Sequence, residues 1–463
     1  MNKILYKTLD YWIDPSQILN CFDGSSFLCA LHSTLPSESD NKIKDLGRYS
    51  FISANPFAVF NALNGDVFFN HKKINKQPYD LNPFDVLNKF MQDYKIETNK
   101  DLPPFQGGAM GYFSYEIGSY LENIPLNQTL SDYDDMVIGI YDWVVSFDHK
   151  EKKVFITACG FNQDANKTID FIYNKIKKVT NFDLVQPKKS SQVITDFTKK
   201  EYEKSVSKVI DYIYDGDIFQ ANMTQPFKVH YDGASPLQVY QYLSHINPAP
   251  FSAYIDCDNF VIASSSPERF IEVNCARVVE TRPIKGTAPR SDDLAKDKKF
   301  SDDLLKSEKD RAENIMIVDL MRNDLSRVCK AGSISVPNVC GLESYQSVHH
   351  LVSTVKGELQ EDKNVFDLLK NCFPGGSITG APKIRSQEII AELESCNRGV
   401  YCGCIGYIGF DGVMDTNIAI RTMTLKDNVA SFNAGGGIVS DSKPESEYEE
   451  TMVKADKMIK VFK

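Results

Sequence analysis

The sequence FSAYIDCDNFVIASSSPERFIEVNCARVVETRP, residues 251–283, contains four runs of aromatic and β-branched residues separated by Asp, Asn, Ser and Pro. Short runs of this composition, bounded by turn-forming residues, predict β-strands. The runs follow one another without the regular strand–helix alternation that accompanies parallel sheets. We therefore expect antiparallel pairing here and, for the whole chain, the α+β class rather than a doubly wound sheet.

The N-terminal third has the same character. Aromatic and β-branched runs fill residues 1–150 and predict further short strands. Residues 163–200 are polar and end in a Lys/Ser-rich segment, which is the best candidate for a linker. Because 463 residues exceed what one compact core usually accommodates, we expect an N-terminal region, residues 1–195, and a second domain, residues 196–463.

Turn and helix signals punctuate these strands. Asn64 and Gly65 form a dipeptide typical of a hairpin turn. Residues 198–217 have the spacing of apolar residues that predicts an amphipathic helix. We expect a long helix over residues 297–330 and a last helix that begins near Pro444.

Composition excludes several classes of protein. A formal net charge of −10 leaves no basic face for nucleic acid, and no stretch reaches the roughly 18 apolar residues of a membrane span. The 11 cysteines suit a reducing compartment, and Cys402 and Cys404 are expected to be buried apolar groups rather than metal ligands. We expect a cytoplasmic protein without a nucleic-acid or membrane partner.

Two pairs of carboxylates have helical spacing. Asp310 and Glu313 are three residues apart, as are Glu447 and Glu450, and Lys454 continues the second stripe. Acids from two helices can converge on a hard divalent cation such as Mg²⁺, which takes few carboxylates and leaves positions for water or substrate. From spacing alone, two solvated helix faces are the alternative.

Two glycine-rich segments are candidates for anion binding. FPGGSITGAPK, residues 373–383, precedes a predicted helix and contains Ser377, so backbone N–H groups and a hydroxyl are available there. Gly435 and Gly437 belong to NAGGGIVSDS, which can form a backbone nest. Arg421 can bind a carboxylate bidentately. Plain turns are the alternative, and the absence of Walker or Rossmann spacing disfavours nucleotide binding.

Together these segments resemble the chorismate-utilising enzymes, which include anthranilate synthase component I, aminodeoxychorismate synthase component I, and the isochorismate and salicylate synthases. The resemblance extends from about Tyr202 to the C-terminus. Nine motifs carry it, in this order: DGDIFQANMTQ, SSPERF, RPIKGT, DRAENIMIVDLMRNDL, SVHHLVS, FPGGSITGAPK, RGVYCGCIGYIG, AIRT and GGGIVSDSKPESEYEETMVKA. It implies two face-packed, largely antiparallel sheets with peripheral helices, and a chorismate-binding catalytic domain over residues 196–463.

The resemblance also implies roles for the matched residues. Glu313 and Glu450 would bind Mg²⁺, with Asp310 and Glu447 close by through water. Glu268 would be an acid near the C4 hydroxyl of chorismate. The substrate-binding groups would be Ser377, Tyr401, Arg421, Gly435, Gly437 and Lys454, with Thr287 and His350 at further active-site positions.

Two positions indicate which reaction to expect. Gln220 stands where water-adding members carry a lysine base, so ammonia is the expected nucleophile. Lys285 stands where anthranilate synthases carry alanine, and RPIKGT resembles aminodeoxychorismate synthases. A neutral amine there can attack C2 of chorismate and expel the C4 hydroxyl, after which ammonia gives 4-amino-4-deoxychorismate, the precursor of 4-aminobenzoate and folate. Burial or nearby cations are expected to lower the pKa of Lys285, and Arg282 is one candidate cation.

Partners follow from the same resemblance. No glutaminase-like Cys–His–Glu arrangement is recognisable, so a separate glutamine amidotransferase subunit is expected to supply ammonia as a heterodimer partner. Ser33, Pro250 and Phe251 lie in segments that resemble a tryptophan pocket between the sheets, with core packing as the alternative. Two other functions stay open: anthranilate synthase component I, and a non-catalytic amino-acid-binding regulatory subunit.

Overall fold

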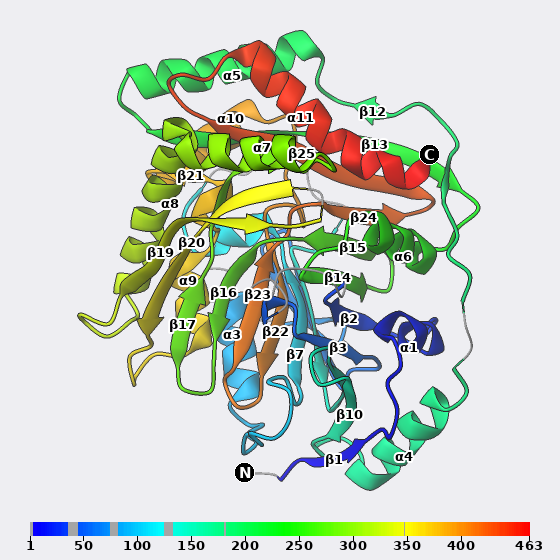
Figure 1. Cartoon of the computed structure of the whole chain (residues 1–463). Coiled ribbons are helices and arrows are strands. Elements are labelled where there is room, and N and C mark those ends of the chain that lie inside the picture. Colours follow the sequence, from blue (N-terminus) through cyan, green and yellow to red (C-terminus); the bar gives the residue numbers. More distant parts are fainter. Residues whose placement is uncertain (1–2, 36–44, 75–81, 125–132, 180–181, 347) are drawn as a thin grey trace.

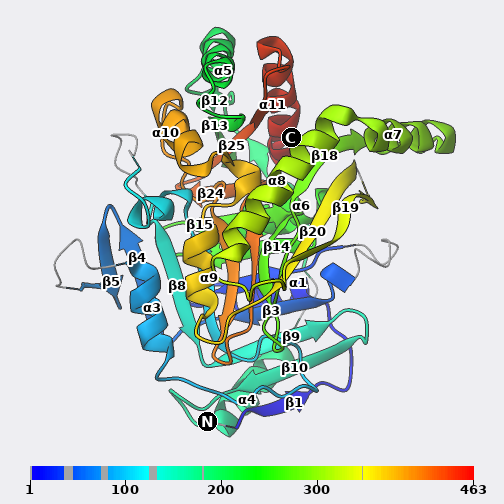
Figure 2. The same cartoon turned by 90° about the vertical axis from the view of Figure 1, so that its left-hand side faces the viewer.

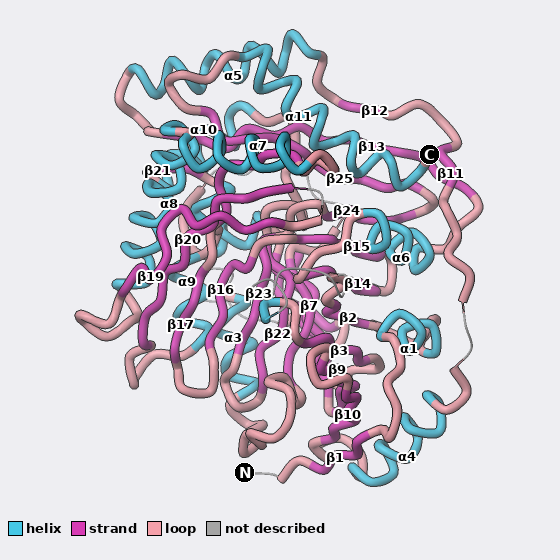
Figure 3. The backbone as a smooth tube through the Cα atoms, viewed as in Figure 1, coloured by secondary structure: helices cyan, strands magenta, loops and turns pink. Residues whose placement is uncertain are grey.

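The structure is a computed structural model and describes residues 3–35, 45–74, 82–124, 133–179, 182–346 and 348–463. Two large β-sheets lie against each other and helices surround them (Figures 1 and 3). Every strand pair among these residues is antiparallel. The predicted α+β class with face-packed antiparallel sheets is confirmed.

The two sheets share strands from both halves of the chain. The first has the order β1 (Leu5–Thr8), β10 (Lys153–Ala158), β9 (Trp143–Asp148), β3 (Tyr49–Ser53), β2 (Cys29–His32), β14 (Phe251–Asp256), β15 (Val261–Ser266), β24 (Thr422–Lys426), β25 (Val429–Ile438), β13 (Gln220–Asp232) and β11 (Lys188–Lys189), with β12 (Ile194–Thr195) and β21 (Gly380–Ala381) also paired to β13. The second has the order β18 (Ile284–Pro289), β20 (Val348–Glu358), β17 (Val278–Thr281), β16 (Arg269–Val273), β23 (Met414–Ile418), β22 (Cys404–Gly409), β7 (Gly108–Phe113), β8 (Met136–Tyr141), β4 (Ala58–Leu63), β5 (Asp66–Phe69) and β6 (Lys72–Lys73), with β19 (Ser335–Ser344) on β20. Residues 1–195 and 196–463 therefore interlock in one pair of sheets.

The chain crosses between the sheets at two adjacent points. The stretch 251–283 contributes β14 and β15 to the first sheet and β16 and β17 to the second, and Glu268 lies at the crossover. A second crossover, which contains Arg421, leads back from β23 to β24. The amide of Ile418 donates to the carbonyl of Glu268, and the amide of Ser265 donates to the carbonyl of Arg421, both at 3.0 Å. These bonds hold the two crossovers side by side.

Apolar side chains fill the space between the sheets. Phe51 and Ala253 from the first sheet pack with Met110, Tyr112 and Ile405 from the second in one buried cluster. Alternate residues of β7 pack in different clusters, Met110 and Tyr112 between the sheets and Ala109 and Phe113 on the other face, because successive side chains of a strand point to opposite faces. The hairpin expected at residues 64–65 joins β4 to β5, as predicted.

Helices cover the outer faces of the sheets. Their bounds are α1 (Pro15–Cys21), α3 (Pro83–Met91), α4 (Ala165–Ile176), α5 (Lys199–Tyr214), α6 (Pro236–Ile246), α7 (Leu294–Lys306), α8 (Glu308–Ser326), α9 (Val365–Cys372), α10 (Lys383–Leu393) and α11 (Pro444–Ile459), with 3₁₀ turns η2 (Tyr115–Tyr120), η3 (Gly376–Ile378) and η4 (Lys460–Phe462). Helices α5 and α11 lie side by side at one end of the molecule, and α8 packs along β20 (Figures 1 and 2). In the described part of the chain, none of the helices combines the length and the apolarity needed to cross a membrane.

The single long helix predicted over residues 297–330 is two helices. The backbone of Ser307 is extended, with φ −63° and ψ 106°, and separates α7 from α8. Its side chain accepts a hydrogen bond from the amide of Asp310 at 3.3 Å and thereby caps α8. Residues 294–326 contain neither proline nor glycine to mark the break, which is why the sequence suggests one helix.

Gly435 is required by the close pairing of β25 with β13. It lies opposite Thr224, and a methyl group added to it would collide with the carbonyl oxygen of Met223. We expect Gly435→Ala to lower the free energy of unfolding by about 1–3 kcal/mol, the usual cost of overpacking. Urea denaturation measures this loss in the free energy of unfolding. Gly436→Ala is the control, because its methyl would meet no atom closer than Lys454 Nζ at 3.5 Å; equal losses in both variants would contradict the steric explanation.

Candidate active site

The two crossovers place Glu268 at the centre of the candidate site. Its side chain is buried, and its Oε1 accepts hydrogen bonds from Ser377 Oγ at 2.7 Å and from the amide of Ile284 at 3.4 Å. Burial raises the pKa of Glu268 to about 7, although the two hydrogen bonds and the charge of Lys285 act to lower it. A carboxyl group with this pKa can donate or accept a proton near neutral pH.

Lys285 points into the same region from β18. A methyl group on Gly437 would lie 3.1 Å from Lys285 Nζ, so the amine sits directly over the glycine run of β25. Burial lowers the pKa of Lys285, and Lys454 lowers it further, while Glu313 and Glu268 raise it. The amine is therefore neutral more often at pH 7 than that of an exposed lysine.

Gln220 lies next to this amine at the start of β13. A methyl group on Gly437 would also collide with its Nε2, which places both side chains over the same glycine. The Gln220 side chain is fully buried, and neither its Oε1 nor its Nε2 has a hydrogen-bond partner. A buried amide without partners costs free energy, so this group is suited to binding a polar ligand.

The two predicted pairs of acids approach the site from different helices. Glu447 Oε2 and Glu450 Oε1, on α11, would lie 3.6 and 3.8 Å from a methyl group on Gly436. Asp310, on α8, lies over Gly286, where a methyl would be 3.1 Å from Asp310 Oδ1. The charges of Glu313 on α8 and of Glu450 and Lys454 on α11 all act on the pKa of Lys285, so the acids and the amine share one site.

Lysines neutralise part of this acid cluster. Lys309 Nζ lies 3.7 Å from Glu447 Oε1, and Lys454 Nζ lies 2.7 Å from Glu450 Oε1. Burial raises the pKa of Glu313, whereas nearby lysines, Lys309 among them, lower it. The cluster thus holds its negative charge beside several cations.

The acids supply the hard oxygen donors that Mg²⁺ prefers. Among the described residues no group of three or more His, Cys, Asp or Glu side chains is close enough to hold a metal by itself. Glu450 is largely exposed, whereas Glu447 is buried and accepts a hydrogen bond from Ser442 Oγ at 2.7 Å. The donor chemistry fits Mg²⁺ if substrate and water complete its coordination.

His350 and Thr287 form a second polar group at the edge of the site. His350 Nδ1 lies 2.9 Å from Thr287 Oγ1 and 3.4 Å from the carbonyl of Gly286. Its Nε2 is buried without a partner. Burial, and then the charge of Arg421, lower the pKa of His350 to about 3, so the ring is neutral. The neighbouring His349 instead hydrogen-bonds Asp297, through Nε2 at 3.1 Å.

Two cations near His350 have no acidic partner. Among the described residues, Arg421 and Lys457 make no hydrogen bond or ion pair through their side chains. Burial and the proximity of Arg421 lower the pKa of Lys457 to about 8, and burial lowers that of Arg421. Sequence reasoning missed Lys457, although its position three residues after Lys454 on one helix was the available signal.

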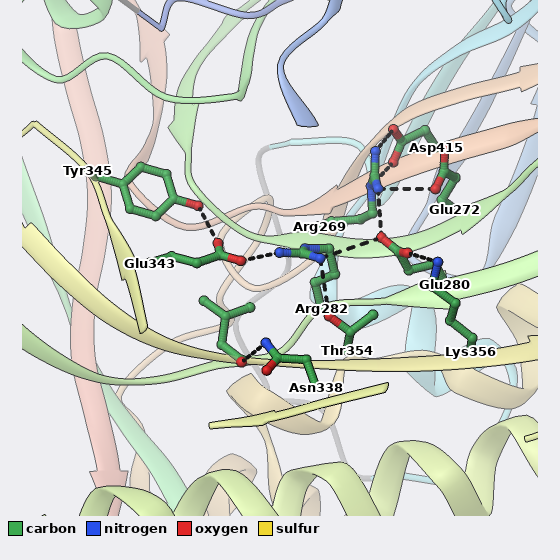
Figure 4. A network of polar contacts seen from close by, with 11 residues as sticks. Arg269, Glu272, Glu280, Arg282, Asn338, Glu343, Tyr345, Thr354, Lys356 and Asp415 are labelled. Carbon is green, nitrogen blue, oxygen red and sulfur yellow. Dashed lines mark hydrogen bonds and ion pairs between the residues drawn. The ribbon is translucent and has the colours of Figure 1, made fainter. Parts of the chain in front are cut away.

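Arg282 does not act as expected. It donates to Thr354 Oγ1 at 3.1 Å and forms an ion pair with Glu343, and it lies 3.9 Å from Glu280 (Figure 4). The cation that lowers the pKa of Lys285 is Lys454. Burial lowers the pKa of Lys285 as expected, but Arg282 was the wrong candidate cation, because its side chain is bound by Glu343 of β19, far from it in the sequence.

The remaining predicted residues are distributed around the same glycine run. Gly435 and Gly437 belong to the extended strand β25 rather than to a nest, because they pair with β13. The carbonyl of Gly435 accepts a hydrogen bond from Lys454 Nζ at 3.0 Å. Tyr401 is buried, and burial raises its pKa well above the ordinary value.

A separate cavity lies between the sheets where the tryptophan pocket was expected. Its volume is about 110 Å³, and Pro250 and Phe251 line it. Ser33 does not line it, and the amide of Ser33 instead donates a hydrogen bond to Ser50 Oγ at 2.9 Å. Arg269 and Asp415 add charged groups to its wall (Figure 4).

Known proteins resemble this chain in fold and in sequence. A family model described as chorismate binding enzyme matches residues 38–460. Aminodeoxychorismate synthase component 1 of Escherichia coli (strain K12) is 39% identical over 89% of this chain and 89% of its own. Anthranilate synthase component 1 of Acetivibrio thermocellus is 35% identical over 99% of this chain and 95% of its own. The crystal structure of anthranilate synthase component I from Streptococcus pneumoniae TIGR4 superposes with a TM-score of 0.77, at 32% identity over 89% of this chain and 92% of that chain. The chain belongs to the chorismate-binding enzyme family.

Gly437→Ala tests the geometry of the site. The methyl would displace the side chains of Gln220 and Lys285 without meeting backbone. We expect chorismate to bind at least about tenfold more weakly, because each displaced polar group is worth about 1–3 kcal/mol, while the protein stays folded. Titration calorimetry with chorismate measures the affinity. Unchanged affinity would show that these side chains do not surround the substrate.

Proposed function

We propose that this protein aminates chorismate at C4 with ammonia to give 4-amino-4-deoxychorismate. One observation supports the proposal above the others: the amine of Lys285 lies over Gly437 inside the site, near the buried carboxyl of Glu268, rather than in solvent. The relatives named aminodeoxychorismate synthase component 1 are consistent with it.

In the first step Lys285 is the nucleophile. Its neutral amine forms a bond to C2 of chorismate, both double bonds of the ring shift by one position, and the C–O bond at C4 breaks. The protonated carboxyl of Glu268 gives its proton to the departing oxygen, which leaves as water, and the amine then loses its extra proton. One difficult displacement is thereby divided into two easier ones.

In the second step ammonia attacks C4. Both double bonds shift back, the bond from C2 to Lys285 breaks, the lysine leaves after regaining a proton, and the new ammonium group at C4 loses one. The buried amide of Gln220 has an unpartnered oxygen and nitrogen beside the amine. An amide cannot take a proton from water at neutral pH, so Gln220 suits the orientation of ammonia rather than the activation of water.

Mg²⁺ bound by Glu313 and Glu450, with Asp310 and Glu447 close by through water, would offset negative charge on the ring carboxylate of the substrate. Arg421, whose side chain makes no ion pair with the described residues, and the buried His350 would bind a second carboxylate.

Other components of the proposal concern partners. A separate glutamine amidotransferase subunit would supply ammonia, in keeping with relatives that are named component 1. The cavity lined by Pro250 and Phe251 would hold tryptophan. The product would serve as precursor of 4-aminobenzoate and folate in the cytoplasm.

The second candidate is anthranilate synthase component I. Relatives with that name are 35–37% identical to this chain. Incubation of the protein with chorismate, Mg²⁺ and ammonium, followed by mass spectrometry and fluorescence of the product, separates the two. We expect aminodeoxychorismate and no fluorescence, whereas fluorescent anthranilate as the main product would establish the second candidate.

Lys285→Ala removes the proposed nucleophile. We expect kcat for amination to fall by about a hundredfold or more, because nucleophilic catalysis and the proton transfer that accompanies it contribute at least that much to the rate. Product formation under saturating ammonium measures the rate. Lys306→Ala, an exposed lysine of α7, is the control and should keep full activity. Undiminished kcat in the Lys285 variant would remove this lysine from the chemistry.

The pH dependence reports the two titrating groups. Glu268 must be protonated, a state it loses as pH rises through its raised pKa of about 7, and Lys285 must be neutral, a state it gains through its lowered pKa. We expect a bell-shaped plot of kcat/KM against pH with one limb near pH 7. Glu268→Gln should be much slower and should lack that limb. If the limb persists in this variant, another group is the acid.

A further inference from the structure

A small cavity lies on the other side of the strands that carry the site. It has a volume of about 30 Å³ and lies between η2 and α10 (α10 is labelled in Figure 2). Tyr115, Glu116, Gln387 and Arg398 are among the residues that line it. A space of this size holds about one or two molecules as small as water.

Glu116 gives this cavity a negative wall. It is 4% exposed, and its Oε1 accepts a hydrogen bond from the amide of Arg398 at 2.7 Å. Its Oε2 is buried without a hydrogen-bond partner, as is the hydroxyl of Tyr115. Burial raises the pKa of Glu116 to about 7. A carboxylate oxygen and a phenol oxygen without partners are acceptors suited to a small donor.

The nearest cation does not neutralise Glu116. The guanidinium of Arg398 is bound by Glu394, with Nε at 2.9 Å and Nη2 at 2.7 Å from the two carboxylate oxygens, and these two charges compensate each other. In the described part of the chain Glu116 makes no ion pair with a lysine, arginine or histidine side chain. In its ionised form Glu116 is therefore a buried carboxylate without an ion-pair partner among the described residues, and a cation in the cavity would stabilise that form.

Arg398 connects the cavity to the active site. Its Nη1 donates to the carbonyl of Ile378 at 2.9 Å, and its Nη2 donates to the carbonyl of Asn222 at 2.6 Å. Ile378 follows Ser377, which bonds the catalytic carboxyl, and Asn222 pairs with Gly437 beneath the lysine. The side chain of Arg398 thus joins the wall of the cavity to two backbone segments of the site.

We propose that the cavity is a binding site for ammonium ion, with Glu116 Oε2 and Tyr115 Oη as acceptors. The ion is as small as water, carries four N–H donors and one positive charge, and matches the unpartnered acceptors. The inference rests on the proposed use of ammonia, and it places the nitrogen donor next to the strands on which chorismate would react. Potassium has similar size and charge but donates no hydrogen bond.

Thermal denaturation tests binding without turnover. We expect the full chain to have a Tm about 1–2 °C higher in ammonium chloride than in sodium or potassium chloride of equal concentration. Glu116→Gln, which keeps the acceptor for the Arg398 amide, should lose this difference, and Glu122→Gln, an exposed acid just after η2, should keep it. Equal Tm values in the three salts, or equal stabilisation by potassium, would overturn the assignment.

Steady-state kinetics tests the role of the site. In Glu116→Gln we expect KM for ammonium to rise about tenfold, since a charge-assisted hydrogen bond is lost, with kcat at saturating ammonium and KM for chorismate unchanged. Glu116→Asp keeps the charge but retracts it and should give a smaller rise. An unchanged KM for ammonium in both variants would overturn the inference. If the wild-type chain makes no aminated product, the proposed function fails, and the thermal measurement still decides whether ammonium binds.

Discussion

Two backbone hydrogen bonds, Ile418 N to Glu268 O and Ser265 N to Arg421 O, fix the point at which the chain crosses between the sheets. Each crossover interrupts a strand ladder, so its side chains are released from the packing between the sheets and turn toward the site. The carboxyl of Glu268 and the guanidinium of Arg421 are thereby held by the same backbone that joins the two halves of the fold. A polar site and a continuous apolar core can coexist only because the crossovers are adjacent.

Burial has opposite effects on the two central groups. It raises the pKa of Glu268 and lowers the pKa of Lys285, because low polarity disfavours the charged form of each. Both groups are thus brought toward the neutral forms that the proposed first step requires. The acids on α8 and α11 oppose this effect on the lysine, and Lys454 supports it. The pKa of Lys285 therefore depends on what binds among those acids, and binding of metal or substrate there would change it.

Local sequence predicted much of the fold. Alternating apolar residues in 251–283 specify strands, and Asn64 and Gly65 specify a hairpin, because side-chain period and turn chemistry act over a few residues. The break at Ser307 was missed because no proline or glycine marks it and a capping serine alone is a weak signal. The resemblance to chorismate-utilising enzymes, rather than spacing alone, brought together the acids, the lysine and the glycine run. The ion pair of Arg282 with Glu343, the buried amide of Gln220 and the cavity at Glu116 depend instead on strands and helices far apart in the chain. No local pattern contains that information.

The central claim is that the amine of Lys285 forms a bond to the ring of chorismate. Rapid quenching of the protein with chorismate and Mg²⁺ in the absence of ammonia, followed by intact-mass and peptide mass spectrometry, tests it most directly. We expect a protein adduct with the mass of chorismate less one water, located on the peptide that contains residues 280–290. Unmodified protein under conditions in which added ammonia gives product would contradict a covalent role for this lysine.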